Sequence, residues 1–266
     1  MTEVQKLIKY CAIALAVFLA ASIIGSIVGL LGLVTGIASR DGVSDRMTEY
    51  SVSAEIRSLE IEAGAAELQI IEGDAFSVKS NLKNLKVNDE DGVLSIVEKK
   101  RFGMHYDGPI LTVTIPSGSS FSRIEITTGA GRFTAAKLSC EDLHLVLGAG
   151  EVIIDELNAT KNAVIDGGAG AVRIKGGALS NPEINMGVGE FELTAAISGN
   201  GEISQGIGST SVTLLGERES YRIEFEGNLG DAKIDGKRAE EGKSYGSGPN
   251  LLEISGGIGK IKVDFE

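Results

Sequence analysis

Apolar and polar residues alternate along most of the chain after residue 50, and glycine interrupts the alternation at regular intervals. In most units, apolar residues stand five and three positions before the first small residue of the interruption. Two more stand two and four positions after its second small residue. Alternation with period two is typical of strands that bury one face. The pattern therefore predicts strand–turn–strand units.

Eight copies of this unit share one register. They occupy residues 59–70, 124–135, 143–154, 163–174, 184–193, 203–214, 223–234 and 252–263. The turns of five copies begin at residues 129, 148, 168, 187 and 206, a spacing of 19 or 20 residues that indicates stacked repeats. One copy cannot bury its apolar row alone, whereas stacked copies bury it jointly. We expect an all-β fold, a single-stranded parallel β-solenoid (β-helix) with Gly-x-Gly repeats, preceded by one transmembrane α-helix.

The glycines of the turns have a structural explanation. Glycine accepts a positive φ and lets neighbouring coils approach closely. Each Gly-x-Gly leads into an alternating strand and not into a helix, so it is not a phosphate-binding loop. The predicted structural turns contain Gly129, Gly131, Gly148, Gly150, Gly168, Gly170, Gly187, Gly189, Gly206, Gly208, Gly257 and Gly259.

The N-terminal part has a different character, since residues 10–38 contain no charge. As a helix these residues would span roughly 43 Å, against about 30 Å of bilayer hydrocarbon. They predict a single-pass membrane anchor. A cleaved signal peptide is the competing interpretation, because small residues at Gly36-Ile37-Ala38 suit a signal peptidase. Lys6, Lys9 and the terminal amine before the segment, against Arg40 and Arg46 after it, favour a cytoplasmic N-terminus by a small margin.

Within this segment, glycines recur at the four-residue spacing that lets membrane helices associate closely. The predicted helix-association face consists of Gly25, Gly29, Gly32 and Gly36. A homo-oligomer held by this face is one expected assembly. The alternative is that glycine is simply common in membrane helices.

The organisation that follows has five parts. They are a short cytoplasmic tail (1–9), the transmembrane helix (10–38), a linker (39–50), an irregular β cap region (51–118) and the solenoid repeats (119–266). In the cap region we expect strands at 76–79, 82–87, 93–97 and 110–115, with a tight turn at Asp91-Gly92. Residues 238–250, rich in charge, Gly and Ser, predict an insertion that projects from the last coil.

Composition narrows the range of functions. The formal charge of −12 repels phosphate backbones, so nucleic acid is not an expected partner. Cys11 and Cys140 fall in the apolar segment and the β region, and therefore cannot pair with each other. Glu151, Asp155 and Asp166 flank turns, but none of their positions keeps a carboxylate across the coils. We interpret them as a solvated face and expect no enzyme, no metal and no cofactor.

One loop breaks the repeat and concentrates basic and aromatic residues in a chain with few aromatics. Its residues are Lys99, Lys100, Arg101, Phe102, His105 and Tyr106. Such a loop suits anionic lipid, a wall polymer or an acidic envelope protein. The alternative is a capping hairpin whose rings cover the end of the solenoid. The loop is the candidate binding site.

The strand Ile110-Leu-Thr-Val-Thr-Ile-Pro116, which opens onto serial Gly-x-Gly turns behind an uncharged N-terminal segment, resembles a known family. The family is that of bacterial putative adhesins, sometimes called toastrack, membrane-anchored β-solenoid domains of unknown function. The resemblance covers residues from about 50 to 266. It implies a cell membrane location with the β domain outside the cytoplasm, and it offers no catalytic residues. We expect a non-catalytic binding, adhesion or envelope-sensing module, or alternatively a passive spacer that oligomerises through its anchor.

Overall fold

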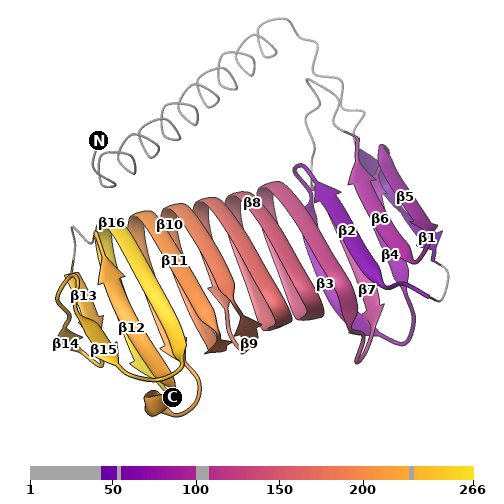
Figure 1. Cartoon of the computed structure of the whole chain (residues 1–266). Coiled ribbons are helices and arrows are strands. Elements are labelled where there is room, and N and C mark those ends of the chain that lie inside the picture. Colours follow the sequence, from indigo (N-terminus) through magenta and orange to yellow (C-terminus); the bar gives the residue numbers. More distant parts are fainter. Residues whose placement is uncertain (1–42, 53–54, 100–107, 228–230) are drawn as a thin grey trace, which may run out of the picture.

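The computed structural model describes residues 43–52, 55–99, 108–227 and 231–266, and these form one all-β unit (Figure 1). The described strands belong to a single 16-stranded sheet in which most pairings are parallel. The strands are β1 (Val43–Ser51), β2 (Ser58–Ala63), β3 (Glu67–Gly73), β4 (Ser77–Leu82), β5 (Leu85–Glu90), β6 (Val93–Glu98), β7 (Ile110–Pro116), β8 (Phe121–Ile174), β9 (Gly177–Ser180), β10 (Pro182–Ser198), β11 (Asn200–Leu214), β12 (Tyr221–Glu226), β13 (Asp231–Ile234), β14 (Lys237–Arg238), β15 (Ser244–Gly246) and β16 (Asn250–Phe265). One short 3-10 helix, η1 (Arg218–Ser220), precedes β12.

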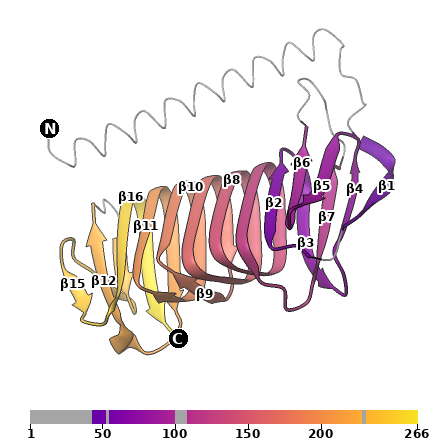
Figure 2. The ribbon, with the colours of Figure 1, turned by 45° about the vertical axis from the view of Figure 1, so that its right-hand side comes forward.

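The middle of the molecule is a stack of coils. The long strands β8, β10, β11 and β16 run through their Gly-x-Gly turns, so that each forms both sides of a corner (Figure 1, Figure 2). Gly189 of β10 pairs with Gly170 of β8 on one side and with Gly208 of β11 on the other. The apolar residues on both sides of the turns pair in the same register. The predicted all-β, parallel stacking of the repeats is confirmed.

At both ends the spatial order of the coils departs from the sequence order. The last copy, in β16, pairs with β11 on one side and with β12 and β13 on the other. The copy at 223–234 therefore lies outside the copy at 252–263. At the other end β6 and β7 form an additional coil outside β2 and β3. Short antiparallel strands then flank the end coils, namely β1, β4 and β5 at one end and β14 and β15 at the other.

Two local predictions were wrong. Residues 238–250 do not project from the last coil, because β15 within them pairs antiparallel with β12 and extends the sheet. The expected strand 82–87 is two strands, since Lys83 and Asn84 form a turn between β4 and β5. The turn at Asp91-Gly92 is confirmed, and both residues have positive φ, of 54° and 77°. Positive φ at both central residues matches the twist of the flanking antiparallel strands β5 and β6.

The inward-facing rows form one continuous apolar core along the rod. The largest side chains in it are Phe121, Phe133, Phe191 and Phe225, all at most 1% exposed. One buried polar pair interrupts the rows, where Thr210 Oγ1 donates to Gln205 Oε1 at 3.2 Å. The core therefore fixes each coil by apolar burial and leaves the outward rows free for polar side chains.

Residues 1–42 lie outside the described part of the chain. The predicted transmembrane helix at 10–38 and its face of Gly25, Gly29, Gly32 and Gly36 therefore also lie outside it. Among the residues that are described, none belongs to a helix long and apolar enough to cross a membrane. Strand β1 starts at Val43 and thus occupies most of the stretch that was assigned to a linker.

Candidate functional site: the turn edge of the solenoid

The Gly-x-Gly turns line up along one edge of the rod, which we call the turn edge. It contains residues 64–66, 129–131, 148–150, 168–170, 187–189, 206–208 and 257–259. The second glycine of a turn has a φ near +140°, as in Gly150 (141°) and Gly189 (139°). A Cβ on Gly189 would lie 1.8 Å from the carbonyl oxygen of Gly170 in the next coil. These glycines are therefore required both by backbone conformation and by space.

The first glycine of each turn is required by space alone. A Cβ on Gly148 would lie 2.1 Å from the carbonyl oxygen of Gly129, and one on Gly168 would lie 2.4 Å from that of Gly148. Backbone therefore packs directly on backbone from coil to coil. All twelve predicted turn glycines occupy these positions on the turn edge.

The middle residue is apolar in all seven described turns of the turn edge, and it is exposed in six of them. It is alanine in the four turns nearest β1, at Ala65, Ala130, Ala149 and Ala169. Larger side chains follow in the next three coils, where Val188, Ile207 and Ile258 are 40%, 43% and 62% exposed. We call these seven residues the apolar ridge.

A buried carboxylate closes the turn edge near β1. Glu98, only 3% exposed, accepts hydrogen bonds from the backbone N–H of Gly64 at 2.5 Å and of Ala65 at 3.3 Å. In the next turn the corresponding N–H of Ala130 donates to the carbonyl of Gly64. The additional coil of β6 and β7 has no Gly-x-Gly turn to supply such a carbonyl, so the Glu98 side chain takes its place.

The candidate binding loop begins at this point, but most of it lies outside the described residues. Only Lys99 is described, and its N–H donates to the carbonyl of Asn84 at 2.9 Å. Lys100, Arg101, Phe102, His105 and Tyr106 fall in the undescribed stretch. On the far side of the loop, the carbonyl of Pro109 accepts from the N–H of Glu67 at 2.7 Å. Both ends of the loop therefore meet the turn edge.

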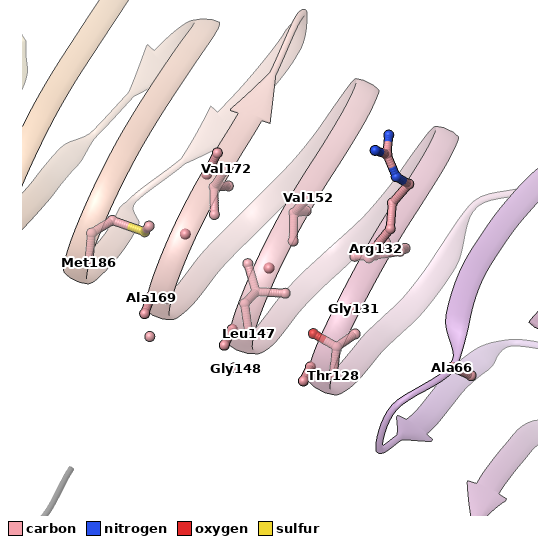
Figure 3. A pocket seen from close by; sticks show the side chains of 18 residues that line it. Ala66, Thr128, Gly131, Arg132, Leu147, Gly148, Val152, Ala169, Val172 and Met186 are labelled. Atoms are coloured by element: carbon pink, nitrogen blue, oxygen red, sulfur yellow. The ribbon is translucent and has the colours of Figure 1, made fainter. Parts of the chain in front are cut away.

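Between the turns nearest the middle of the rod there is a small hollow (Figure 3). Gly148, Leu147, Ala169 and Met186 contribute to its lining. Its volume open to the centre of a water molecule is about 20 Å³, enough for a single water. Small-molecule sites usually occupy about 300–1,000 Å³. The hollow is therefore a packing feature of the turn edge.

The outer face beside the turn edge carries ion pairs that join successive coils. Arg173 contacts three carboxylates, those of Glu192 at 3.1 Å, Glu190 at 2.8 Å and Glu151 at 3.1 Å. The negative charge of Glu192 and then of Glu190 raises the pKa of the Arg173 guanidinium. Arg132 binds Glu151 from the next coil at 2.8 Å. Glu151, expected to be a solvated carboxylate, thus serves as a bridge between three coils.

The structure also reveals a row of carboxylates that sequence reasoning missed. Glu183 pairs with Glu202, Glu202 with Glu253 and Glu253 with Glu224, each from one coil to the next. We call these four residues the acidic row. In the sequence each of the four stands four positions before its turn, and this regularity is visible without a structure. The sequence does not reveal that the four are neighbours in space, because the coil of Glu253 lies between those of Glu202 and Glu224.

Two reactive side chains of the described residues, Cys140 and His144, lie on the middle coils. Burial first, and the charge of Asp142 second, raise the pKa of the Cys140 thiol to about 12, so it is protonated near neutral pH and a poor nucleophile. His144 lies 3.6 Å from Asp166 on the outer face. No three histidines, cysteines or carboxylates within the described ranges are grouped as metal ligands would be.

Parallel coils, a continuous apolar core and a glycine turn edge together define a β-solenoid. A model of the Toastrack family, DUF4097, matches residues 77–251, and the chain belongs to this family. The resemblance inferred from the Gly-x-Gly turns is thereby confirmed.

Several solved structures are similar to this chain. A putative cell adhesion protein from Clostridium sporogenes is 16% identical, with 83% of this chain and 99% of that one covered and a TM-score of 0.38. A putative adhesin from Bacteroides fragilis is 10% identical over 83% and 98% of the two chains, with a TM-score of 0.36. A putative lipid binding protein from Parabacteroides distasonis is 17% identical over 81% and 96%, with a TM-score of 0.35. No curated protein matches the chain.

Proposed function

We propose that this protein is a non-catalytic binding module, held at the cell membrane by residues 10–38 with its solenoid outside the cytoplasm. The observation that carries the proposal is the acidic row, an extended, in-register row of like side chains on the outside of the rod. Stacked repeats use such surfaces to contact large partners. An envelope protein or a wall polymer is the class of partner that fits a rod of this kind.

The non-catalytic part of the proposal is supported by the chemistry of the described side chains. The Cys140 thiol is buried and protonated, and the hollow on the turn edge has room for one water. The carboxylates of Glu151, Glu190 and Glu192 form ion pairs with Arg173 from a neighbouring coil. A general acid or base needs a substrate within hydrogen-bonding reach. On the described outer face, the hollow beside Glu202 and Glu253 has a volume of about 90 Å³, below the range of about 300–1,000 Å³ that is usual for small-molecule sites.

The location is supported by the sequence of the N-terminal part. Residues 10–38 are long enough to cross a bilayer, and the slight excess of basic charge before them favours a cytoplasmic N-terminus. The family match covers residues 77–251 and so supports the fold of the module but not its location.

Photo-crosslinking in cells tests the proposal. A crosslinking residue is placed at Phe102 or Tyr106 of the full-length protein, and the captured molecules are identified. We expect a specific envelope protein or wall polymer whose capture is lost in the Lys99, Lys100, Arg101→Ala variant. The matched control is a Lys233, Lys260, Lys262→Ala variant, which removes the same charge from the opposite end of the rod.

Two results would contradict the binding role of the loop. Capture that persists in the Lys99, Lys100, Arg101→Ala variant would place the partner elsewhere. Capture of nothing but further copies of the chain would favour the alternative of a passive spacer. In that case the copies would be joined through the face of Gly25, Gly29, Gly32 and Gly36.

A further inference from the structure

The apolar ridge places large apolar side chains on an exposed surface, where a protein surrounded by water usually has polar ones. Five large apolar side chains are exposed among the described residues, and three of them are Val188, Ile207 and Ile258. These three are direct neighbours, since Val188 pairs with Ile207 and Ile207 with Ile258. Scattered exposed apolar residues are ordinary, but a contiguous row marks a surface that is covered by something.

The chain enters the fold on the same turn edge. Strand β7 runs away from that edge in parallel with β3, and β4 runs back toward it, so Leu82 lies at the edge. Val43 of β1 pairs with Leu82. The four residues 39–42 that separate Val43 from the apolar segment span at most about 14 Å. An anchor at residues 10–38 therefore holds this end of the turn edge close to the bilayer.

We propose that the solenoid lies on its side, with its turn edge on the bilayer and the side chains of Val188, Ile207 and Ile258 inserted among the lipid headgroups and upper acyl chains. This inference rests on the proposed anchor. Counted across the sheet, with β8 contributing three coils, β10 lies seven strand spacings from β1 and β16 lies nine. At about 4.8 Å for each spacing, these strands are roughly 34 Å and 43 Å from β1. A rod standing upright would carry the ridge that far from the membrane, whereas a rod lying down places the anchor and the ridge on one plane.

A bilayer fits the ridge better than a second protein does. The ridge is a single side chain wide and is flanked by the turn glycines, most of which are half-buried. A stable protein interface buries about 800 Å² on each partner, far more than one row of three side chains supplies. A lipid surface needs no complementary shape, and apolar side chains on one line can each reach it.

The charges beside the ridge indicate which lipids suit it. Arg132 and Lys260 follow their turns directly, but so do Glu151 and Glu190, so these positions beside the ridge carry no excess of positive charge. The net charge of the whole chain is −12. The ridge itself is therefore expected to enter zwitterionic bilayers through apolar contact, without attraction to anionic headgroups.

The chain contains no tryptophan, so one introduced tryptophan reports its own surroundings. We would reconstitute full-length Ile258→Trp into phosphatidylcholine vesicles with and without bromine on the acyl chains. The control is Asn200→Trp, an exposed position on β11 seven residues before Ile207 and roughly 23 Å from it. We expect bromine to quench the emission of Ile258→Trp about twofold and to leave that of Asn200→Trp nearly unchanged.

The outcomes separate the docking from the anchor on which it rests. Unquenched Ile258→Trp in a chain that stays in the vesicles at alkaline pH would overturn the docking and keep the anchor. A chain washed out at alkaline pH would overturn the anchor, and the docking with it. Blue-shifted emission that bromine does not quench would mean that a second copy covers the ridge, and would also overturn the docking. As a second test, Ile207→Ser with Ile258→Ser is expected to reduce the quenching of Val188→Trp by at least about half.

Discussion

The middle coils of the solenoid and its two end regions use the same repeat but connect it differently. In the middle, residues 124–214, each coil lies next to its neighbours in sequence, and backbone packs on backbone along the turn edge. At the ends, the order of the coils changes and antiparallel strands flank the stack. The middle is thus specified by glycine at fixed intervals, while the ends depend on individual side chains and local turns. The predictions below test that difference.

Replacing a turn glycine in the middle is expected to have the largest effect. In Gly189→Ala the new methyl group would lie 1.8 Å from the Gly170 carbonyl oxygen, at a φ of 139°. Relief requires two coils to separate, so we expect a loss of about 3–5 kcal/mol in the free energy of unfolding. Urea denaturation followed by circular dichroism measures it.

A glycine from the end region serves as the matched control for this prediction. Gly236, between β13 and β14, also has a positive φ (72°), but no atom lies within 4 Å of the position of a Cβ. Gly236→Ala should cost only about 1 kcal/mol. Equal losses in the two variants would mean that backbone conformation, and not the contact between coils, makes glycine necessary on the turn edge.

At the end near β1, removal of a single side chain should have the next largest effect. Glu98→Ala leaves the N–H groups of Gly64 and Ala65 without their buried acceptor. We expect a loss of about 2–3 kcal/mol, against at most about 0.5 kcal/mol for the exposed control Glu90→Ala. Hydrogen exchange at Gly64 and Ala65 should accelerate in the first variant only. Unchanged exchange there would show that Glu98 does not close the turn edge.

The same division explains what the sequence could predict. Period-two alternation and Gly-x-Gly spacing fix the strands, the register and the turns of the middle coils, because each copy meets a near-identical neighbour. Nothing in the spacing reveals that the coil of Glu253 lies between those of Glu202 and Glu224, since that order depends on a long connection through β15. The acidic row and the role of Glu98 were missed for this reason. Both arise from contacts between segments that are distant in sequence.

A buried thiol in the middle coils gives a pH-dependent prediction. Burial raises the pKa of Cys140 to about 12 in the folded state, above the ordinary value of 9.0. Between these values the unfolded chain releases the proton and the folded chain retains it. Stability from this group is therefore complete below pH 9 and falls as the pH rises toward 12, by roughly 1 kcal/mol per pH unit.

The comparison for Cys140 needs a reference without the thiol. In a Cys11→Ser background, the free energy of unfolding of the chain with Cys140 should fall more steeply between pH 9 and pH 11 than that of Cys140→Ala. All other ionisable groups are the same in both proteins, so the difference isolates the thiol. Parallel pH profiles would show that Cys140 ionises as readily in the fold as in the unfolded chain.

The smallest effect is expected where the middle coils are joined by exposed charges. Arg173 holds the carboxylates of Glu151 from the coil on one side and of Glu190 and Glu192 from the coil on the other, and Arg173→Gln leaves three like charges together. The control Arg123→Gln removes an arginine that contacts one carboxylate, Glu125, at 3.5 Å. We expect Arg173→Gln to lower the urea midpoint more than Arg123→Gln, but less than either Gly189→Ala or Glu98→Ala does. Since these groups are open to solvent, the difference should shrink at about 1 M salt, where the screening length is about 3 Å. A difference that persists in high salt would mean that Arg173 acts through packing of its aliphatic stem between the coils, and the ion pairs would then be incidental to how the middle coils are held.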